Sequence, residues 1–458
     1  MTATTPRLLI VLLHLVCGAG AASQEPTPPP QEPPPQSPTP VPTPETGADA
    51  VPPSVPSEAE RPGRFKVGGF YLTPYMRFGS IGFDSNVLYT PTERQPDFTV
   101  DGGPGLEAVL PFKRSSALTL DANVSYLYFA KTESQRRFNR SARALLELGS
   151  YSFGVPATTA VEDVFRPPSV TSVEETYLNT NARFSLEIDE RVPRISEGTR
   201  ALLMRPLLGR FGIELSGGRS RQRAEGEVIY LGNNLSVNLD QRHAAAGGGL
   251  RYYATIKTAL VVLADYDWNR FPRAPERDSD ALRVWGGIET DTTALISGHV
   301  LVGLKRFKPV DPNRLEKQST EVDVDAMYSI SPRTRLGGGY KRGLGYSYLS
   351  APGEDPTLLT EVVEARIEKE LWDRFDIRLV GRRTRLTSGG LVTIEQPDGT
   401  VVTSERNDST EQAGFNLGYS FRPKVRVGID ATYTNRESNF AYFGIEGLIF
   451  GVTVDYIP

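Results

Sequence analysis

The chain has 458 residues, of which 39% are apolar, and its formal net charge is −4. Its mean hydropathy is −0.31, and no stretch approaches the roughly 18 apolar residues of a membrane-spanning helix, which excludes a helical membrane protein. Acidic and basic residues are equal in number after Pro62, so nucleic-acid binding has no electrostatic support.

The first 23 residues have the pattern of a secretory signal peptide. Arg7 supplies a positive start, Leu8 to Cys17 form an apolar core, and Ala19-Gly20-Ala21 offers small residues for cleavage. Cys17 is the only cysteine, so we expect no thiolate ligand or nucleophile in the mature chain. Residues 24–66 are rich in proline and cannot bury a core, which predicts a disordered periplasmic linker.

From about Phe70 to Tyr456 apolar and polar residues alternate with period two. In the stretch Ala117–Tyr128, for example, Leu118 and Leu120 fall on one face and Asp121 on the other. Residues two apart share a face of a strand. Repeated amphipathic segments about ten residues long are typical of a transmembrane β-barrel. We therefore predict that residues 67–458 form an all-β, antiparallel up-and-down barrel of about 18 strands, with 16 as the alternative.

Two kinds of connector alternate along the predicted barrel. Short ones, expected to be periplasmic turns, include Ser331-Pro332-Arg333-Thr334, Trp372-Asp373-Arg374 and Arg422-Pro423-Lys424. Longer polar ones, expected to be external loops, include Arg270–Asp280, Val310–Lys317, Leu349–Thr357 and Ser388–Asp408. Counting hairpins this way places both termini on the periplasmic side.

Two segments resist this assignment. Val192–Pro206 is long for a periplasmic turn, and we expect a connector that holds a short helix. Arg221–Asp240 is interpreted either as a long external loop or as a loop that folds inward.

Strand parity turns a set of charged residues toward the interior, and a barrel of this size encloses solvent. The predicted lumen wall consists of Asp265, Asp267, Arg283, His299, Lys305, Glu321, Asp323, Asp325, Glu364, Arg366, Asp376, Arg378 and Arg382. Two interpretations stay open. Opposite signs in different sectors of the wall would create a transverse field that aligns a polar solute. Alternatively, the charges hydrate a wide pore and pair with their neighbours.

Residues that carry catalysis are sparse. His243 and His299 are the two histidines of the predicted mature chain, and we expect His299 to be a solvated wall residue. No spacing suggests a nucleophile with its base, a phosphate loop or a zinc site. Glycine clusters such as Gly247-Gly248-Gly249 are expected to relieve crowding or to bend a strand. The sequence thus predicts a protein that is not an enzyme, with no cofactor and no metal.

The stretch Phe70-Tyr71-Leu72-Thr73-Pro74, followed by Gly82-Phe83-Asp84-Ser85-Asn86-Val87-Leu88, resembles the beta-barrel porin 2 family. The resemblance covers roughly Gly68 to Pro458. It implies an outer-membrane barrel, and some members are associated with export of exopolysaccharide or capsule through a periplasmic polysaccharide-export partner. The ending Asp455-Tyr456-Ile457-Pro458 departs from the terminal aromatic residue that such barrels usually carry.

Together these observations predict a channel for hydrophilic cargo in the outer membrane of a Gram-negative-type bacterium, in contact with lipid. The resemblance makes exopolysaccharide or capsular polysaccharide the preferred cargo. Three alternatives stay open: a general diffusion porin for small solutes, a plugged structural or adhesive surface barrel, and a secreted β-sandwich that binds carbohydrate.

Overall fold

The computed structural model describes residues 65–456, except 92, 114–115, 151–168, 184, 186, 190, 232, 256, 291–294, 350–353, 373, 396–398 and 423. The predicted signal peptide and nearly all of the proline-rich linker lie outside the described residues. None of the helices in the described part is long and apolar enough to cross a membrane.

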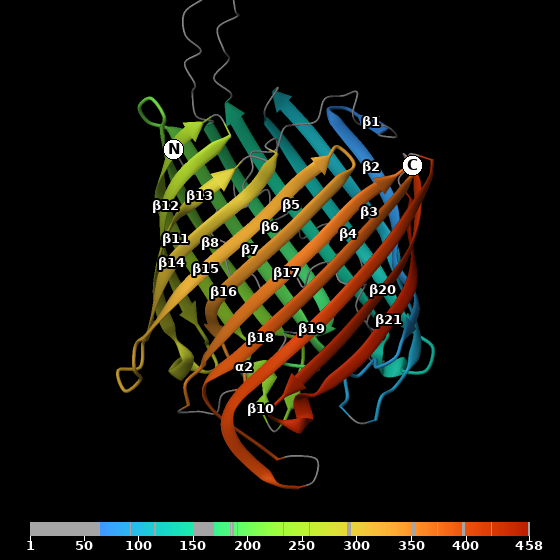
Figure 1. The fold of residues 1–458 in the computed structure, drawn as a ribbon, viewed down its shortest axis with the longest axis vertical. Helices are drawn as coiled ribbons and strands as arrows, with labels where there is room; N and C mark the ends of the chain where they lie inside the picture. Colours follow the sequence, from blue (N-terminus) through green and yellow to red (C-terminus); the bar gives the residue numbers. More distant parts are fainter. Residues whose placement is uncertain are drawn as a thin grey trace, which may run out of the picture.

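The described strands form an antiparallel sheet that closes on itself as an eighteen-stranded barrel (Figure 1). The barrel strands are β2 (Phe70–Asp84), β3 (Asp97–Lys113), β4 (Ser116–Phe129), β5 (Arg137–Ser150), β6 (Ser169–Arg183), β7 (Arg191–Pro206), β8 (Phe211–Ala224), β11 (Gln241–Thr255), β12 (Thr258–Arg270), β13 (Ser279–Thr290), β14 (Ile296–Pro309), β15 (Lys317–Ser331), β16 (Thr334–Tyr346), β17 (Thr357–Leu371), β18 (Phe375–Glu395), β19 (Val401–Arg422), β20 (Val425–Ser438) and β21 (Ile445–Tyr456). The predicted fold class and strand number are confirmed.

Each barrel strand pairs with the next one along the chain, and β21 pairs back with β2, where Phe83 lies opposite Phe450. A closed ring leaves no strand edge exposed. A short strand, β1 (Phe65–Val67), adds to β2, so strand structure begins two residues before the predicted boundary at residue 67. The smaller elements are β9 (Ile229–Tyr230), β10 (Asn233–Asn234), α2 (Leu235–Asn238), η2 (Glu133–Gln135), η3 (Pro275–Arg277) and η4 (Ala441–Phe443).

The two rims of the barrel differ. β1 begins and β21 ends at one rim, which we call the turn end, where the connectors are short turns except for residues 151–168 between β5 and β6 (Figure 1). Most of the other longer connectors gather at the opposite rim, the loop end (Figure 1). Two of the predicted connectors prove to be strands. Val192–Pro206 belongs to β7, and most of Ser388–Asp408 extends β18 and β19 beyond a register shift after Thr387. Both segments find backbone partners on neighbouring strands, which outweighs their loop-like composition.

Apolar side chains face outward and polar ones inward, as β12 shows. Exposure alternates along this strand, with Val262 59% exposed on the outside and Asp265 7% exposed on the inside. Aromatic rings also lie on the outer face near the loop end, where Tyr266 and Trp268 have ring centroids 4.9 Å apart. An apolar exterior flanked by aromatic residues suits a lipid bilayer.

Glycines on the inner face admit large neighbouring side chains. A Cβ at Gly247 would lie 2.3 Å from Asp265 Oδ1, and one at Gly249 would lie 2.3 Å from Leu263 Cδ2. The prediction that this cluster relieves crowding is confirmed.

Adjacent positions on β17 allow a test of the two faces. Val363 faces outward and is 53% exposed, whereas Val362 pairs with Lys341 on the inner face. Replacing Val363 with Arg should destabilise the folded barrel by up to about 2 kcal/mol, because the charge enters the lipid-facing surface directly opposite Arg383. Urea unfolding in lipid vesicles measures this loss. The control Val362→Arg should lose much less, and equal losses would contradict the assignment of faces.

Candidate functional site

The predicted wall residues all lie on the contiguous strands β12 to β18, on the face opposite the exposed apolar side chains. Arg283 is the centre of one group. Its guanidinium lies 3.7 Å from Asp265, 3.8 Å from Asp267 and 3.6 Å from Glu321, and Lys305 Nζ lies 3.9 Å from Glu321. All five side chains are at most 10% exposed. The group is therefore a buried network of opposite charges.

A second group continues around the wall. Arg366 contacts Asp325 at 2.8 Å and Glu364 at 3.3 Å, and Arg382 pairs with the same Glu364. Opposite charges again alternate from strand to strand. Arg378 is the exception, since its side chain is 51% exposed and its guanidinium lies 3.6 Å from Glu368.

The histidines also have acidic neighbours. His299 Nε2 lies 3.0 Å from Asp323 Oδ1, and His243 Nε2 lies 3.2 Å from Asp267 Oδ1. The expectation that His299 is a solvated wall residue was wrong, since its side chain is only 10% exposed. Around Arg283 and Arg366, acidic and basic residues alternate from strand to strand, which contradicts separate acidic and basic sectors in that part of the wall. Antiparallel register places residues from distant parts of the sequence side by side, so their fields largely cancel.

Part of the interior is apolar. Val261 and Leu263 on β12, Trp285 on β13 and Leu301 on β14 form a buried cluster on the inner face, each at most 4% exposed. Strand parity shows only that these residues face inward. Because these side chains are buried, neighbouring protein atoms and not solvent cover this sector of the wall.

At the loop end, the connectors pack against one another. The loop-end cluster contains Ile188, Val192, Tyr230, Leu235, Leu239, Tyr348, Leu349, Val392, Ile394, Phe440 and Phe443, all at most 6% exposed. Leu235 and Leu239 lie in and directly after α2 and are fully buried. The segment Arg221–Asp240 therefore continues β8 to Ala224 and then packs into this cluster, which favours the inward-folded alternative.

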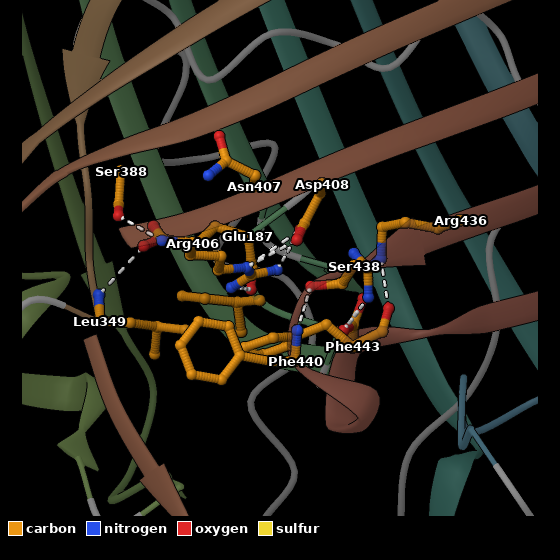
Figure 2. A network of polar contacts seen from close by, with 12 residues as sticks. Glu187, Leu349, Ser388, Arg406, Asn407, Asp408, Arg436, Ser438, Phe440 and Phe443 are labelled. Carbon is orange, nitrogen blue, oxygen red and sulfur yellow. Dashed lines mark hydrogen bonds and ion pairs between the residues drawn. The ribbon is translucent and has the colours of Figure 1, made fainter. Parts of the chain in front are cut away.

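Glu187 holds several connectors together (Figure 2). It lies between β6 and β7, and its carboxylate accepts hydrogen bonds from Ser347 Oγ, from the Tyr348 amide at 2.7 Å and from the Leu349 amide at 3.4 Å, all in the connector between β16 and β17. These strand pairs are not neighbours in the sheet. The contact therefore bridges separate parts of the barrel rim.

Two buried arginines complete the bridge (Figure 2). Arg406 on β19 donates to the Glu187 carbonyl at 2.9 Å and pairs with Asp408 at 2.6 Å, while its guanidinium lies 3.3 Å from the ring centroid of Phe443. Arg436 on β20 pairs with Asp189, also between β6 and β7. Arg406 and Arg436 are at most 2% exposed. Removing either partner of such a pair leaves a buried charge, so the contacts are strongly coupled.

Tyrosine hydroxyls add neutral contacts to the loop-end cluster. The Asp189 amide donates to Tyr230 Oη, and the Tyr348 hydroxyl donates to Gln241 at 3.3 Å. Burial raises the pKa of both Tyr230 and Tyr348 above the ordinary value for a phenol. Both hydroxyls therefore stay protonated at physiological pH.

The turn end holds a cavity of about 560 Å³. It lies against β16 to β21 and the facing part of β2. Its inward-facing polar lining includes Arg77, Arg335, Glu368, Asp376, Arg378, Arg382, Gln412, Asn416, Arg426, Asp430, Thr432, Thr453 and Asp455. Asp376, Arg378 and Arg382 are the predicted wall residues that it brings together. This end of the lumen therefore combines space with charge.

Several interior groups are not among the residues predicted from the sequence. Arg251 contacts Glu214 at 2.5 Å and also pairs with Glu289, and all three are buried or nearly so. Asp430 and the loop-end arginines were missed as well. The alternation of residues along the strands would have predicted that Arg251 and Asp430 face inward. No local sequence pattern predicts the contact between Glu187 and Arg406. Within the described ranges, no group of three or more His, Cys, Asp or Glu residues could hold a metal ion.

No family model matches the chain, so the resemblance to the beta-barrel porin 2 family finds no support there, and no curated protein matches either. Solved structures do match. OpdK from Pseudomonas aeruginosa with vanillate shares 10% identity over 85% of this chain and 98% of that chain, with a TM-score of 0.44. OccAB3 from Acinetobacter baumannii shares 10% identity over 86% and 100%, with a TM-score of 0.42.

A further match is the siderophore receptor PirA from Pseudomonas aeruginosa, at 11% identity over 84% of this chain and 80% of that chain, with a TM-score of 0.40. Likenesses this distant transfer neither a residue role nor a solute. The architecture rests on the strand pairing itself.

Arg406 provides a test of the loop-end cluster. Arg406→Ala should leave Asp408 buried without its partner, at a cost of about 3 to 5 kcal/mol. Hydrogen exchange of the amides at 347–349 and 439–444 should then accelerate by about a hundredfold or more, while the strands stay protected. The control is Arg383→Ala, because Arg383 and Glu411 form an exposed pair at 3.6 Å. Unchanged exchange in the Arg406 variant would contradict the bridge.

Proposed function

We propose that this protein is an outer-membrane channel for small hydrophilic solutes, that it is not an enzyme, and that it resides in a Gram-negative-type bacterium. The observation that carries the proposal is a closed barrel with an apolar exterior and a charged interior that encloses a cavity of about 560 Å³. Backbone groups in lipid must be satisfied internally, and closure achieves this. Apart from residues 151–168, the connectors are short at the turn end and longer at the loop end. This asymmetry is typical of outer-membrane barrels and supports periplasmic termini.

Two features favour small solutes over a polymer. The turn-end cavity has the volume of a small-molecule site, and the loop-end cluster bridges the opposite rim through buried contacts. Export of exopolysaccharide or capsule, with a periplasmic partner, is the alternative that the sequence resemblance suggests. It requires the loop-end cluster to open, since a sugar chain must thread through that rim.

A plugged structural or adhesive barrel is the second alternative. The buried ion pairs of Arg406 and Arg436 favour it, because they join connectors from separate parts of the rim. Conductance distinguishes a constricted channel from a closed barrel.

Planar-bilayer recording of the purified full chain tests the proposal. The wild-type protein should conduct ions, and Arg406→Ala should conduct more, because the variant loosens the loop-end cluster. Arg383→Ala should match the wild type. Neutral polyethylene glycols of increasing size would give the solute cutoff. Zero conductance from both the wild type and Arg406→Ala would refute the channel and favour the plugged barrel.

Polysaccharide export has its own measurement. Deleting the gene and quantifying surface polysaccharide should leave the amount unchanged if the barrel serves small solutes. A clear loss of surface polysaccharide would favour export instead.

A further inference from the structure

One row of inward-facing residues crosses the turn-end cavity. It runs Arg335, Glu368, Arg378, Asn416, Asp430 and Gly451, each directly opposite the next in the strand register from β16 to β21. All but Gly451 line the cavity. The row thus places a basic end and an acidic end in one continuous line along the wall.

The basic end carries excess positive charge. Arg335 and Arg378 share a single carboxylate, Glu368, at 2.8 Å and 3.6 Å. Their side chains are 55% and 51% exposed. One carboxylate balances one of the two guanidinium groups, so the pair attracts an anion that enters the cavity.

Asp430 forms the acidic end. It is 3% exposed, and neither carboxylate oxygen has a hydrogen-bond partner. Arg426 precedes it by four residues on the same face, but this guanidinium is held by Asp376 at 3.0 Å and by Asn416 at 2.7 Å. A buried carboxylate is costly unless it is paired. The oxygens of Asp430 are therefore available to a donor in the cavity.

Asp430 lines the cavity among small polar side chains. Gly451 lies opposite it on β21, and Ser80 Oγ of β2 lies 2.5 Å from the point where a Cβ of residue 451 would stand. Thr453 lines the same cavity, and its Oγ1 has no hydrogen-bond partner. A donor at Asp430 therefore has a second acceptor on the neighbouring strand.

We propose that this row is a binding site for a zwitterionic solute. The ammonium group of the solute donates to Asp430 and Thr453, and its carboxylate accepts from Arg378. The inference rests on the proposed channel function, since the solute reaches the site through the lumen. Two strand spacings separate Arg378 from Asp430, about 10 Å between their Cα atoms. This span suits an ammonium and a carboxylate separated by several methylene groups better than an α-amino acid.

Calorimetry on the detergent-solubilised full chain tests the site with 6-aminohexanoate as the probe. Hexanoate and hexylammonium are matched probes that each carry one charge. The zwitterion should bind more tightly than either. Asp430→Asn should weaken zwitterion binding by about tenfold or more and leave hexanoate unaffected. Arg378→Gln should weaken zwitterion and hexanoate binding and spare hexylammonium.

Glu411→Gln is the matched control, since Glu411 is an exposed acid on β19 that pairs with Arg383. It should bind all three probes as the wild type does. Heat-dependent mobility on a detergent gel verifies that each variant is folded, and Asp430→Ser replaces Asp430→Asn if the latter fails to fold.

The inference is overturned if the zwitterion binds no tighter than both single-charge probes, or if folded Asp430 variants bind it like the wild type. Potassium binding that depends on Asp430, without any binding of the zwitterion, would show an inorganic cation site. This result would also overturn the inference. Failure of the channel proposal is a separate result. It appears as zero conductance in the bilayer recording, whereas failure of the site leaves conductance intact and abolishes only the discrimination among probes.

Discussion

Closure of the sheet through β2 and β21 is the constraint on which the rest of the structure depends. Once Phe83 lies opposite Phe450 and the ring is complete, every strand has two partners and no edge remains. Each residue then faces either outward or inward by parity. The apolar exterior and the charged interior are two consequences of this single geometric fact.

Charged residues in the interior form ion pairs with their near neighbours. Antiparallel pairing places Arg283 among Asp265, Asp267 and Glu321, so buried opposite charges compensate one another within a few ångströms. A buried charge is tolerated only with such partners. Arg283 and Lys305 thus offset most of the charge of these three carboxylates. Uncompensated groups therefore stand out, and Asp430 is the clearest of those described.

The two rims of the barrel differ in how they are packed. The loop end is packed and bridged, with Glu187 and Arg406 joining connectors from separate strands. The turn end keeps a cavity lined by half-exposed arginines and by Asp430. In the proposed channel, selection in the turn-end cavity and restriction at the loop end are compatible, because the two sets of residues share no side chain. Weak, paired contacts in the cavity would allow a solute to bind and still leave.

The sequence by itself determined the class of fold, the strand number and the face of residues such as Asp265 and Val363, because parity is a local property with period two. It misassigned Val192–Pro206 and Ser388–Asp408, since a strand with loop-like composition is recognised only by its partners. Register, closure and the packing of the connectors were decided by tertiary structure alone. Glu187 and Arg406 are 219 residues apart, and Arg378 meets Asp430 only through β19, so no window of sequence contains either site.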